Sequence, residues 1–116
     1  VVHPMSSVSP SAVISPGTVI CAGAIINARA SLGIACIVNT GATIDHDCIL
    51  EDGVHISPGA NLAGDVSVGA QSWIGIGACV RDGMRIGRNV TVGAGAAVVS
   101  DVPDDVVVSG IPARTR

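Results

Sequence analysis

Aliphatic residues recur at every sixth position along most of the chain. Starting at Val2 and stepping by six, seventeen consecutive positions up to Val98 hold Val, Ile or Leu. These three residue types make up 34 of the 116 residues, so one such run has a chance probability of roughly 10⁻⁹ when matches are counted. A period of six excludes an amphipathic helix, whose apolar stripe recurs at three and four residues.

Each hexad predicts a short strand followed by a corner. The residue two places before the aliphatic is usually small, and the third residue after it is often Gly, Asp or Asn. The small and aliphatic residues point inward with one outward residue between them, which is the alternation of a strand. Gly, Asn and Asp tolerate the positive φ of a corner. Three hexads then close one triangular coil, and coils stack about 4.8 Å apart through parallel strand pairing.

The repeat also suggests where the domain ends. It runs without an insertion to Val98 and breaks at Asp104, where another aliphatic residue is due. We therefore expect a β-helix domain over residues 1–102. Residues 103–116 should leave the coil as a C-terminal extension that packs on the helix or on a neighbouring subunit. Its segment Val106–Val108 would protect an open strand edge.

Composition fits a narrow interior. Nearly half of the residues are hydrophobic, at 48%, yet there is one Trp and no Tyr or Phe, whereas Gly occurs 15 times. An ordinary core of this size would use aromatic side chains to fill volume. The net charge of −3 and the absence of a basic stripe argue against a nucleic-acid surface. We also expect no membrane insertion, because there is no apolar run of membrane-spanning length.

The four cysteines form no CxxC pair and show no zinc spacing. Cys36 and Cys48 fall where small inward residues are expected, so we interpret them as reduced core residues. Reduced thiols predict a cytoplasmic location.

A histidine between two carboxylates is the clearest sign of chemistry. His46 lies between Asp45 and Asp47, and an imidazole beside a carboxylate can take a proton near neutral pH. The hexad register places His46 at the corner between the first and second sides of the prism. Ala28 lies one coil before it and Gly64 one coil after it. From spacing alone, a corner residue without chemistry is the alternative.

Glycines stack at a second corner, between the third and first sides. Such glycines let a thin ligand lie against backbone amides. His55 faces outward on the third side, and Trp73 follows it one coil later. This corner is a full side away from His46, so we predict a homotrimer with active sites between subunits. The stacked segments are Asn39–Gly41, Ser57–Gly59, Gly75–Gly77 and Gly93–Gly95.

Four stretches of the sequence carry a more specific signal than the repeat itself. They read INARASLGIACIVNTGATIDHDCILEDGVHISPGANLAGDVSVG, WIGIGACV, VGAGAAVVSDVP and GIPAR. They resemble the C-terminal domain of a bacterial hexapeptide-repeat sugar acetyltransferase family. That family includes sialic acid O-acetyltransferases and the UDP-4-amino-sugar N-acetyltransferases of bacillosamine and perosamine pathways. The resemblance implies a single-stranded left-handed parallel β-helix, a handedness that periodicity does not show. Members usually carry an N-terminal Rossmann-like domain as well, and this chain begins at Val1 without Met, as a fragment of a longer protein would.

The resemblance implies direct acetyl transfer from acetyl-CoA, without a metal, to an amino or hydroxyl group of a nucleotide-linked sugar. His46 matches the general base, and Asp47 matches an acidic residue that raises the proton affinity of the base. Ala94 replaces a Gly found in some members. The residues assigned to acetyl-CoA are His55, Gly64, Gly75, Ile76 and Ala94, and the residue assigned to the acceptor is Asn39.

Two other functions stay open from the sequence. A β-helix by itself only provides a rigid surface, so a non-catalytic assembly or binding module is one alternative. A metal protein like the γ-class carbonic anhydrases, which share the predicted fold, is another. The pattern of close paired histidines in those enzymes is missing here, since His46 and His55 are nine residues apart.

Overall fold

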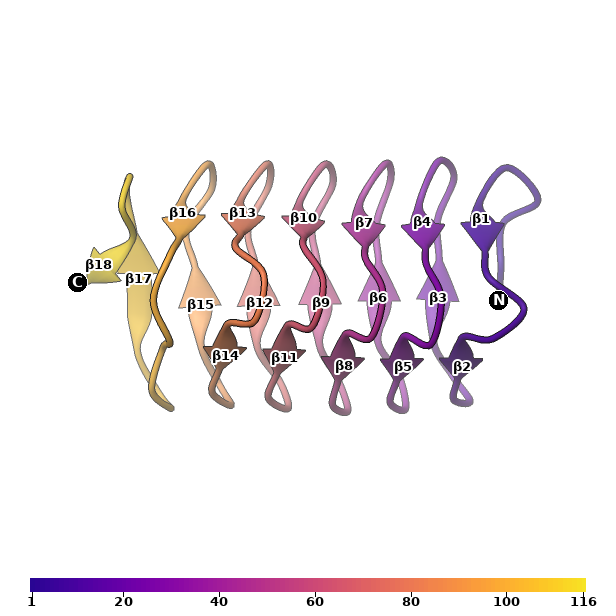
Figure 1. Ribbon diagram of the computed structural model, residues 1–116, viewed down its shortest axis with the longest axis horizontal. Helices are drawn as coiled ribbons and strands as arrows, with labels where there is room; N and C mark the ends of the chain where they lie inside the picture. The colour runs from indigo at the N-terminus through magenta and orange to yellow at the C-terminus, as the bar shows by residue number, and fades with distance from the viewer.

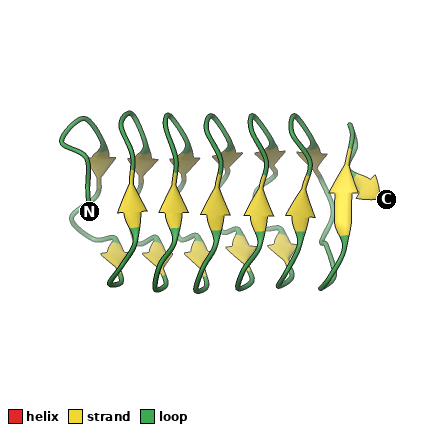
Figure 2. Ribbon diagram, turned by 180° about the vertical axis from the view of Figure 1, so that it is seen from behind, coloured by secondary structure: helices red, strands yellow, loops and turns green.

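In the computed structural model, which describes residues 1–116, the chain winds into stacked triangular coils (Figure 1). Short strands joined by tight corners run in rows along the long axis, and the two termini lie at opposite ends (Figure 2). The prism measures 37 × 20 × 20 Å along its principal axes. This is the all-β architecture that the hexad predicts. The structure contains no helix, and so none that is long and apolar enough to cross a membrane.

Each coil adds one strand to each of three sheets. Sheet one has six strands, in the order β1 (Ser7–Val8), β4 (Ile25–Ile26), β7 (Thr43–Ile44), β10 (Asn61–Leu62), β13 (Cys79–Val80) and β16 (Ala97–Val98). Sheet two has five, β2 (Val13–Ile14), β5 (Ser31–Leu32), β8 (Ile49–Leu50), β11 (Ser67–Val68) and β14 (Arg85–Ile86). Sheet three has seven, β3 (Val19–Ile20), β6 (Ile37–Val38), β9 (His55–Ile56), β12 (Trp73–Ile74), β15 (Thr91–Val92), β17 (Val107–Ser109) and β18 (Arg114–Thr115).

Neighbouring strands pair in parallel at a constant offset along most of the prism. In sheet one, Ile26 pairs with Ile44 and Leu62 pairs with Val80, an offset of 18 residues in each case (44 − 26 and 80 − 62). A constant offset keeps every position of the hexad in register with its equivalents on the coils before and after. The prediction of three hexads per coil is therefore confirmed.

The core is a single column of aliphatic side chains with small residues between them. Its 28 buried hydrophobic residues form one cluster. Ile44 and Leu62 are at most 1% exposed, whereas Thr43 and Asn61, the strand residues before them, face outward. Each fully buried Ile or Leu contributes about 1.5–3 kcal/mol relative to an exposed one. The aliphatic stack therefore supplies the main stabilisation of a prism that lacks an aromatic core.

The cysteines behave as small side chains. Cys36 and Cys48 are fully buried, as predicted. Their thiols lie 3.1 Å from the backbone carbonyl oxygens of Glu51 and Ala63, respectively. Burial raises the pKa of both thiols, which disfavours the nucleophilic thiolate. All four cysteines of the chain are free.

The corners have positive φ at their third residue. Gly, Asp and Asn fill most of these places, as predicted, and Asp47 has a φ of 60°. Three other residues adopt the same left-handed conformation although their side chains disfavour it. They are Arg29, Ala35 and Gln71.

The last coil is two residues shorter than the others. Ile86 pairs with Val102, an offset of 16 (102 − 86), and β17 pairs with β15 at the same offset. Val102 therefore takes the inward place two residues earlier than the hexad predicts, and Val108 follows it as a buried residue. Strand β17 extends sheet three in parallel, and β18 pairs with it in the antiparallel direction. The coil thus continues past Asp104, and the division of the chain at residue 102 stays a prediction.

Candidate active site at two corners of the prism

The corner between β7 and β8 positions His46 against a carboxylate. Nδ1 of His46 lies 3.0 Å from Oδ2 of Asp47. Oδ1 of Asp47 accepts a hydrogen bond from Nε of Arg29 at 2.8 Å, and Oδ2 accepts another from Nη2 at 3.0 Å. The guanidinium, carboxylate and imidazole thus form one continuous row. Nε2 of His46 has no hydrogen-bond partner within the protein.

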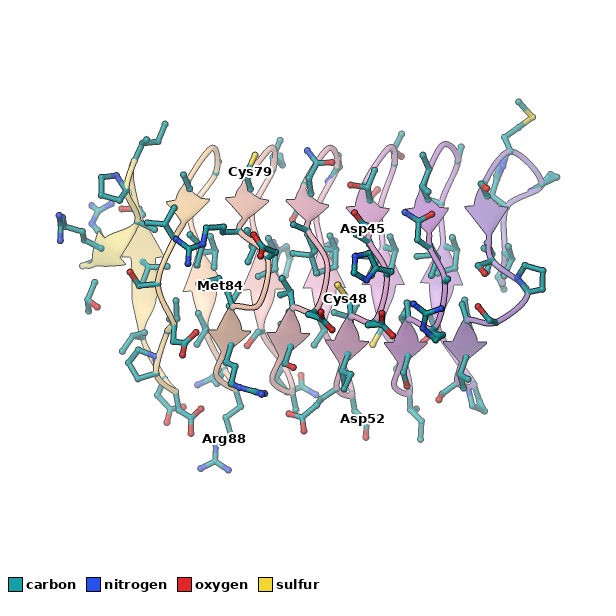
Figure 3. All side chains as sticks on the ribbon, in the orientation of Figure 1. Asp45, Cys48, Asp52, Cys79, Met84 and Arg88 are labelled. Carbon is teal, nitrogen blue, oxygen red and sulfur yellow. The ribbon has the colours of Figure 1, made fainter.

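Asp45 stabilises the same corner from the other side. Its Oδ1 accepts a hydrogen bond from the backbone N–H of His46 at 2.7 Å and another from Nδ2 of Asn27 at 3.1 Å. These hydrogen bonds lower the pKa of Asp45. Figure 3 shows Asp45 on the near corner, whereas Asp52 and Arg88 project from a different corner of the prism. Asp45 therefore fixes the backbone from which the imidazole projects.

The charges around His46 favour its protonated form. The hydrogen bond to Asp47 raises the pKa of His46 above its usual 6.5, partial desolvation opposes this, and the charges of Asp45, Asp47 and Asp65 add to it. Hydrogen bonds from Arg29 and His46 lower the pKa of Asp47 to about 2. Asp47 is ionised near neutral pH and can only accept a hydrogen bond. We therefore assign the neutral imidazole the Nδ1–H tautomer, which leaves the lone pair on Nε2.

Gly64 lies against the imidazole ring. A β-carbon built on Gly64 would overlap Nε2 and Cε1 of His46. The two residues occupy the same corner on consecutive coils, as the register predicts. The structure therefore places Gly64 with the imidazole and not with the other residues assigned to acetyl-CoA.

Those other residues lie together at the glycine corner. A shallow groove of about 350 Å³ follows the outer face of sheet three into this corner. His55 and Trp73 line it from the sheet, and Gly75, Ile76 and Ala94 line it from the corner. A larger hollow of about 450 Å³ lies on sheet two and contains none of the predicted site residues.

An aromatic pair and an amide border the groove. The ring centroids of His55 and Trp73 are 4.2 Å apart, with the planes tilted by 49°. Nε1 of Trp73 donates a hydrogen bond to Oγ of Ser57 at 2.9 Å. Nδ2 of Asn39 lies 3.3 Å from Nε2 of His55, so Asn39 lies beside the groove and not at the corner of His46. Burial lowers the pKa of His55, which makes its ring neutral near pH 7.

Solved structures resemble this chain over nearly its whole length. The acetyltransferase domain of PglB from Neisseria gonorrhoeae FA1090, in complex with acetyl coenzyme A, is 50% identical with a TM-score of 0.99. The match covers 99% of this chain and 56% of that one. A variant of perosamine N-acetyltransferase from Caulobacter crescentus, in complex with CoA and GDP-perosamine, is 44% identical with a TM-score of 0.97. That match covers 99% of this chain and 55% of the other.

This chain resembles hexapeptide-repeat acetyltransferase domains. The likeness confirms the predicted resemblance to sugar acetyltransferases and the predicted left-handed parallel β-helix. Among curated proteins, a galactoside O-acetyltransferase from Lactococcus lactis is 40% identical over 58 residues, which is 50% of this chain and 28% of that protein. A serine acetyltransferase from Synechococcus elongatus is 34% identical over 84 residues, 71% of this chain and 34% of that protein. No family model matches the chain.

The domain spans about half the length of the solved structures and about a third of the curated relatives. It contains no group of three or more His, Cys, Asp or Glu side chains that could hold a metal ion. His46 lies at a corner, whereas His55 lies on the outer face of sheet three in β9, so within one chain they do not form a paired site.

Two residues of this domain were not assigned roles from the sequence. Arg29 was missed because its partner, Asp47, is 18 residues away (47 − 29). Trp73 was noted only as a neighbour of His55, although it is the one aromatic residue among the Tyr, Phe and Trp types. A search for polar pairs separated by one coil would have found the first. The rarity of aromatic residues was a signal for the second.

Proposed function

We propose that this domain transfers an acetyl group from acetyl-CoA directly to an amino or hydroxyl group of a nucleotide-linked sugar. The observation that carries the proposal is the His46–Asp47 pair with Nε2 free of any protein partner. The similarity to solved structures that contain acetyl coenzyme A, or CoA with GDP-perosamine, supports this choice of donor and acceptor.

In the proposed reaction, Nε2 of His46 accepts a proton from the acceptor as its nitrogen or oxygen attacks the thioester carbonyl carbon. The carbonyl oxygen becomes an oxyanion in the tetrahedral intermediate. Collapse of the intermediate breaks the carbon–sulfur bond, and the imidazolium returns the proton to the departing thiolate. Asp47 stabilises the imidazolium while it exists.

The backbone at Gly64 is placed to stabilise the oxyanion. Its N–H donates to no acceptor in the protein, and the residue lies against the ring of His46. A donor fixed before the reaction begins strengthens its interaction as negative charge develops on the oxygen. We assign Gly64 to this function in place of a general contact with the coenzyme.

The groove on sheet three is the proposed site for the coenzyme. The backbone N–H groups of Ile76 and Ala94 donate to no protein acceptor, so they are free to bind the amide carbonyl groups of the pantetheine arm. His55 and Trp73 provide an aromatic wall. Gly75 packs so closely against the backbone of Val92 and Ala94 that a β-carbon would not fit there. Asn39, beside His55, is the proposed contact for the acceptor.

The catalytic base and the groove lie at opposite edges of sheet one, because the glycine corner precedes each of its strands and the corner of His46 follows β7. An active site that uses both therefore requires a second subunit. We propose a homotrimer in which His46 of one subunit faces the groove of the next. We also propose a cytoplasmic location, since all four cysteines are free.

The test of the proposed function is a turnover assay with a panel of nucleotide amino-sugars and sialic acid. The release of CoA thiol is followed optically, and the acetylated product is identified by mass spectrometry. We expect acetylation of at least one nucleotide-linked sugar, and none with the His46→Ala variant. If calorimetry detects no binding of acetyl-CoA to a folded trimer, the domain is a non-catalytic module instead.

A further inference from the structure

Arg29 occupies an unusual place in the corner that precedes His46. It lies 18 residues before Asp47 (47 − 29), at the same turn position one coil earlier, and has a φ of 59°. Nine glycines adopt positive φ in this chain, because a residue without a β-carbon is not crowded there. An arginine at this position is disfavoured by the backbone, so its side chain is the feature to explain.

The guanidinium of Arg29 holds the carboxylate of Asp47 by both oxygens. The hydrogen bonds from Nε to Oδ1 and from Nη2 to Oδ2 measure 2.8 and 3.0 Å. Such a fork fixes the plane of a carboxylate, which otherwise rotates freely about its terminal torsion. The same Oδ2 faces Nδ1 of His46. The orientation of the carboxylate seen by the imidazole is therefore set by Arg29.

Asn27, two residues earlier, has the equivalent function on the other side of His46. Its Nδ2 donates to Oδ1 of Asp45, which in turn accepts the backbone N–H of His46. Asn27 and Arg29, one coil before His46, thus bind the carboxylates of Asp45 and Asp47 on either side of it. Arg29 controls the one that contacts the ring.

We propose that Arg29 is a positioning residue, which holds the carboxylate of Asp47 so that His46 keeps its proton on Nδ1 and its lone pair on Nε2. The inference rests on the proposed function of His46 as the base. A neutral imidazole in water favours the opposite tautomer, with the proton on Nε2, and that form cannot accept a proton from the acceptor at Nε2. A mobile Asp47 would bind Nδ1–H only part of the time, and the reactive tautomer would become the minor one.

The variant that tests this inference is Arg29→Gly. Glycine suits the positive φ, so the fold is retained or made more stable. The tautomer is read from the ¹⁵N chemical shifts of the His46 imidazole in the unliganded protein, above the pKa of the ring. We expect Nδ1–H in the wild type and mainly Nε2–H in Arg29→Gly. We also expect kcat to fall on the order of tenfold with the KM for acetyl-CoA unchanged.

Rescue and control variants complete the experiment. Arg29→Asn should restore part of the Nδ1–H population, because Nδ2 of Asn89 donates to Oδ1 of Asp105 between equivalent turn positions of this chain. Arg81→Gln removes an arginine of the same corner whose guanidinium makes no hydrogen bond or ion pair, and it should change neither the tautomer nor kcat.

The inference is overturned if folded Arg29→Gly keeps the Nδ1–H tautomer, or if its kcat equals that of the wild type. The tautomer measurement needs no substrate. A tautomer that switches in a protein without acetyltransferase activity would therefore refute the proposed function and support the positioning of the ring by Arg29.

Discussion

The imidazole of His46 lies against Gly64, the residue that takes the same corner position one coil later. A β-carbon at Gly64 would occupy the place of the ring, although the backbone there does not have a positive φ and would accept alanine. We predict that Gly64→Ala displaces the imidazole and lowers kcat by about 10²-fold. Thermal unfolding should change little. Steady-state assays with melting curves followed by circular dichroism check this, and wild-type turnover in Gly64→Ala would contradict it.

The pH dependence of the reaction should report on Asp47. His46 must be neutral to act as a base, so kcat/KM should rise with pH and level off above a pKa higher than 6.5. Asp47→Asn removes the charge and hydrogen bond that stabilise the imidazolium, so the pKa falls and the rising limb moves to lower pH. The plateau rate should also fall. If the rising limb of the pH–rate profile does not move in Asp47→Asn, the interaction of Asp47 with His46 is contradicted. Asp65→Asn serves as a control, in which the limb should shift by a smaller amount.

Subunit mixing should restore activity if each site is shared. His46→Ala is expected to lower kcat by roughly 10²–10⁴-fold, and Ala94→Trp should fill the groove. In a mixed trimer, some interfaces combine the intact groove of one subunit with the intact His46 of its neighbour. We predict partial recovery of turnover after the two inactive variants are unfolded and refolded together. Mixed trimers seen by native mass spectrometry without any recovery would place the whole site within one chain.

Trp73 should report directly on the coenzyme. It is the only tryptophan of the chain, its side chain is about half exposed, and it lines the groove beside His55. Acetyl-CoA bound there should change the tryptophan emission in proportion to occupancy. Trp73→Ala should weaken binding by about 1 kcal/mol, measured by calorimetry. Binding detected by calorimetry with unchanged emission would move the coenzyme to another surface, such as the hollow on sheet two.

The aliphatic residue at every sixth position predicted the strands, because each strand of a coil places one such residue in the core. Val8 and Val98, the second and the last positions of that run, are the second residues of β1 and β16. The shorter last coil could not be predicted in this way. Removing two residues moves the inward place from Asp104 to Val102, and only the pairing of strands reveals where the residues are lost.

The site was predicted in part, for a physical reason. His46 and Asp47 are adjacent in sequence, so their pairing could be inferred without coordinates. The contact of Arg29 with Asp47 depends on the reach of a long side chain from one coil to the next. The place of Asn39 beside His55 likewise depends on side-chain directions at a corner, which a six-residue period does not specify.

The constant offset of 18 residues between the paired strands before the last coil gives each residue of those coils a height along the prism that follows from its number. One coil corresponds to about 4.8 Å, so His46 and Ala94, 48 residues apart (94 − 46), differ in height by about 13 Å. A rotation about an axis parallel to the prism leaves heights unchanged. In the proposed trimer, the same difference therefore separates His46 of one subunit from Ala94 of the next. Acetyl-CoA that contacts Ala94 while its acetyl group meets His46 must lie lengthwise along the prism, with the nucleotide directed toward the C-terminal end.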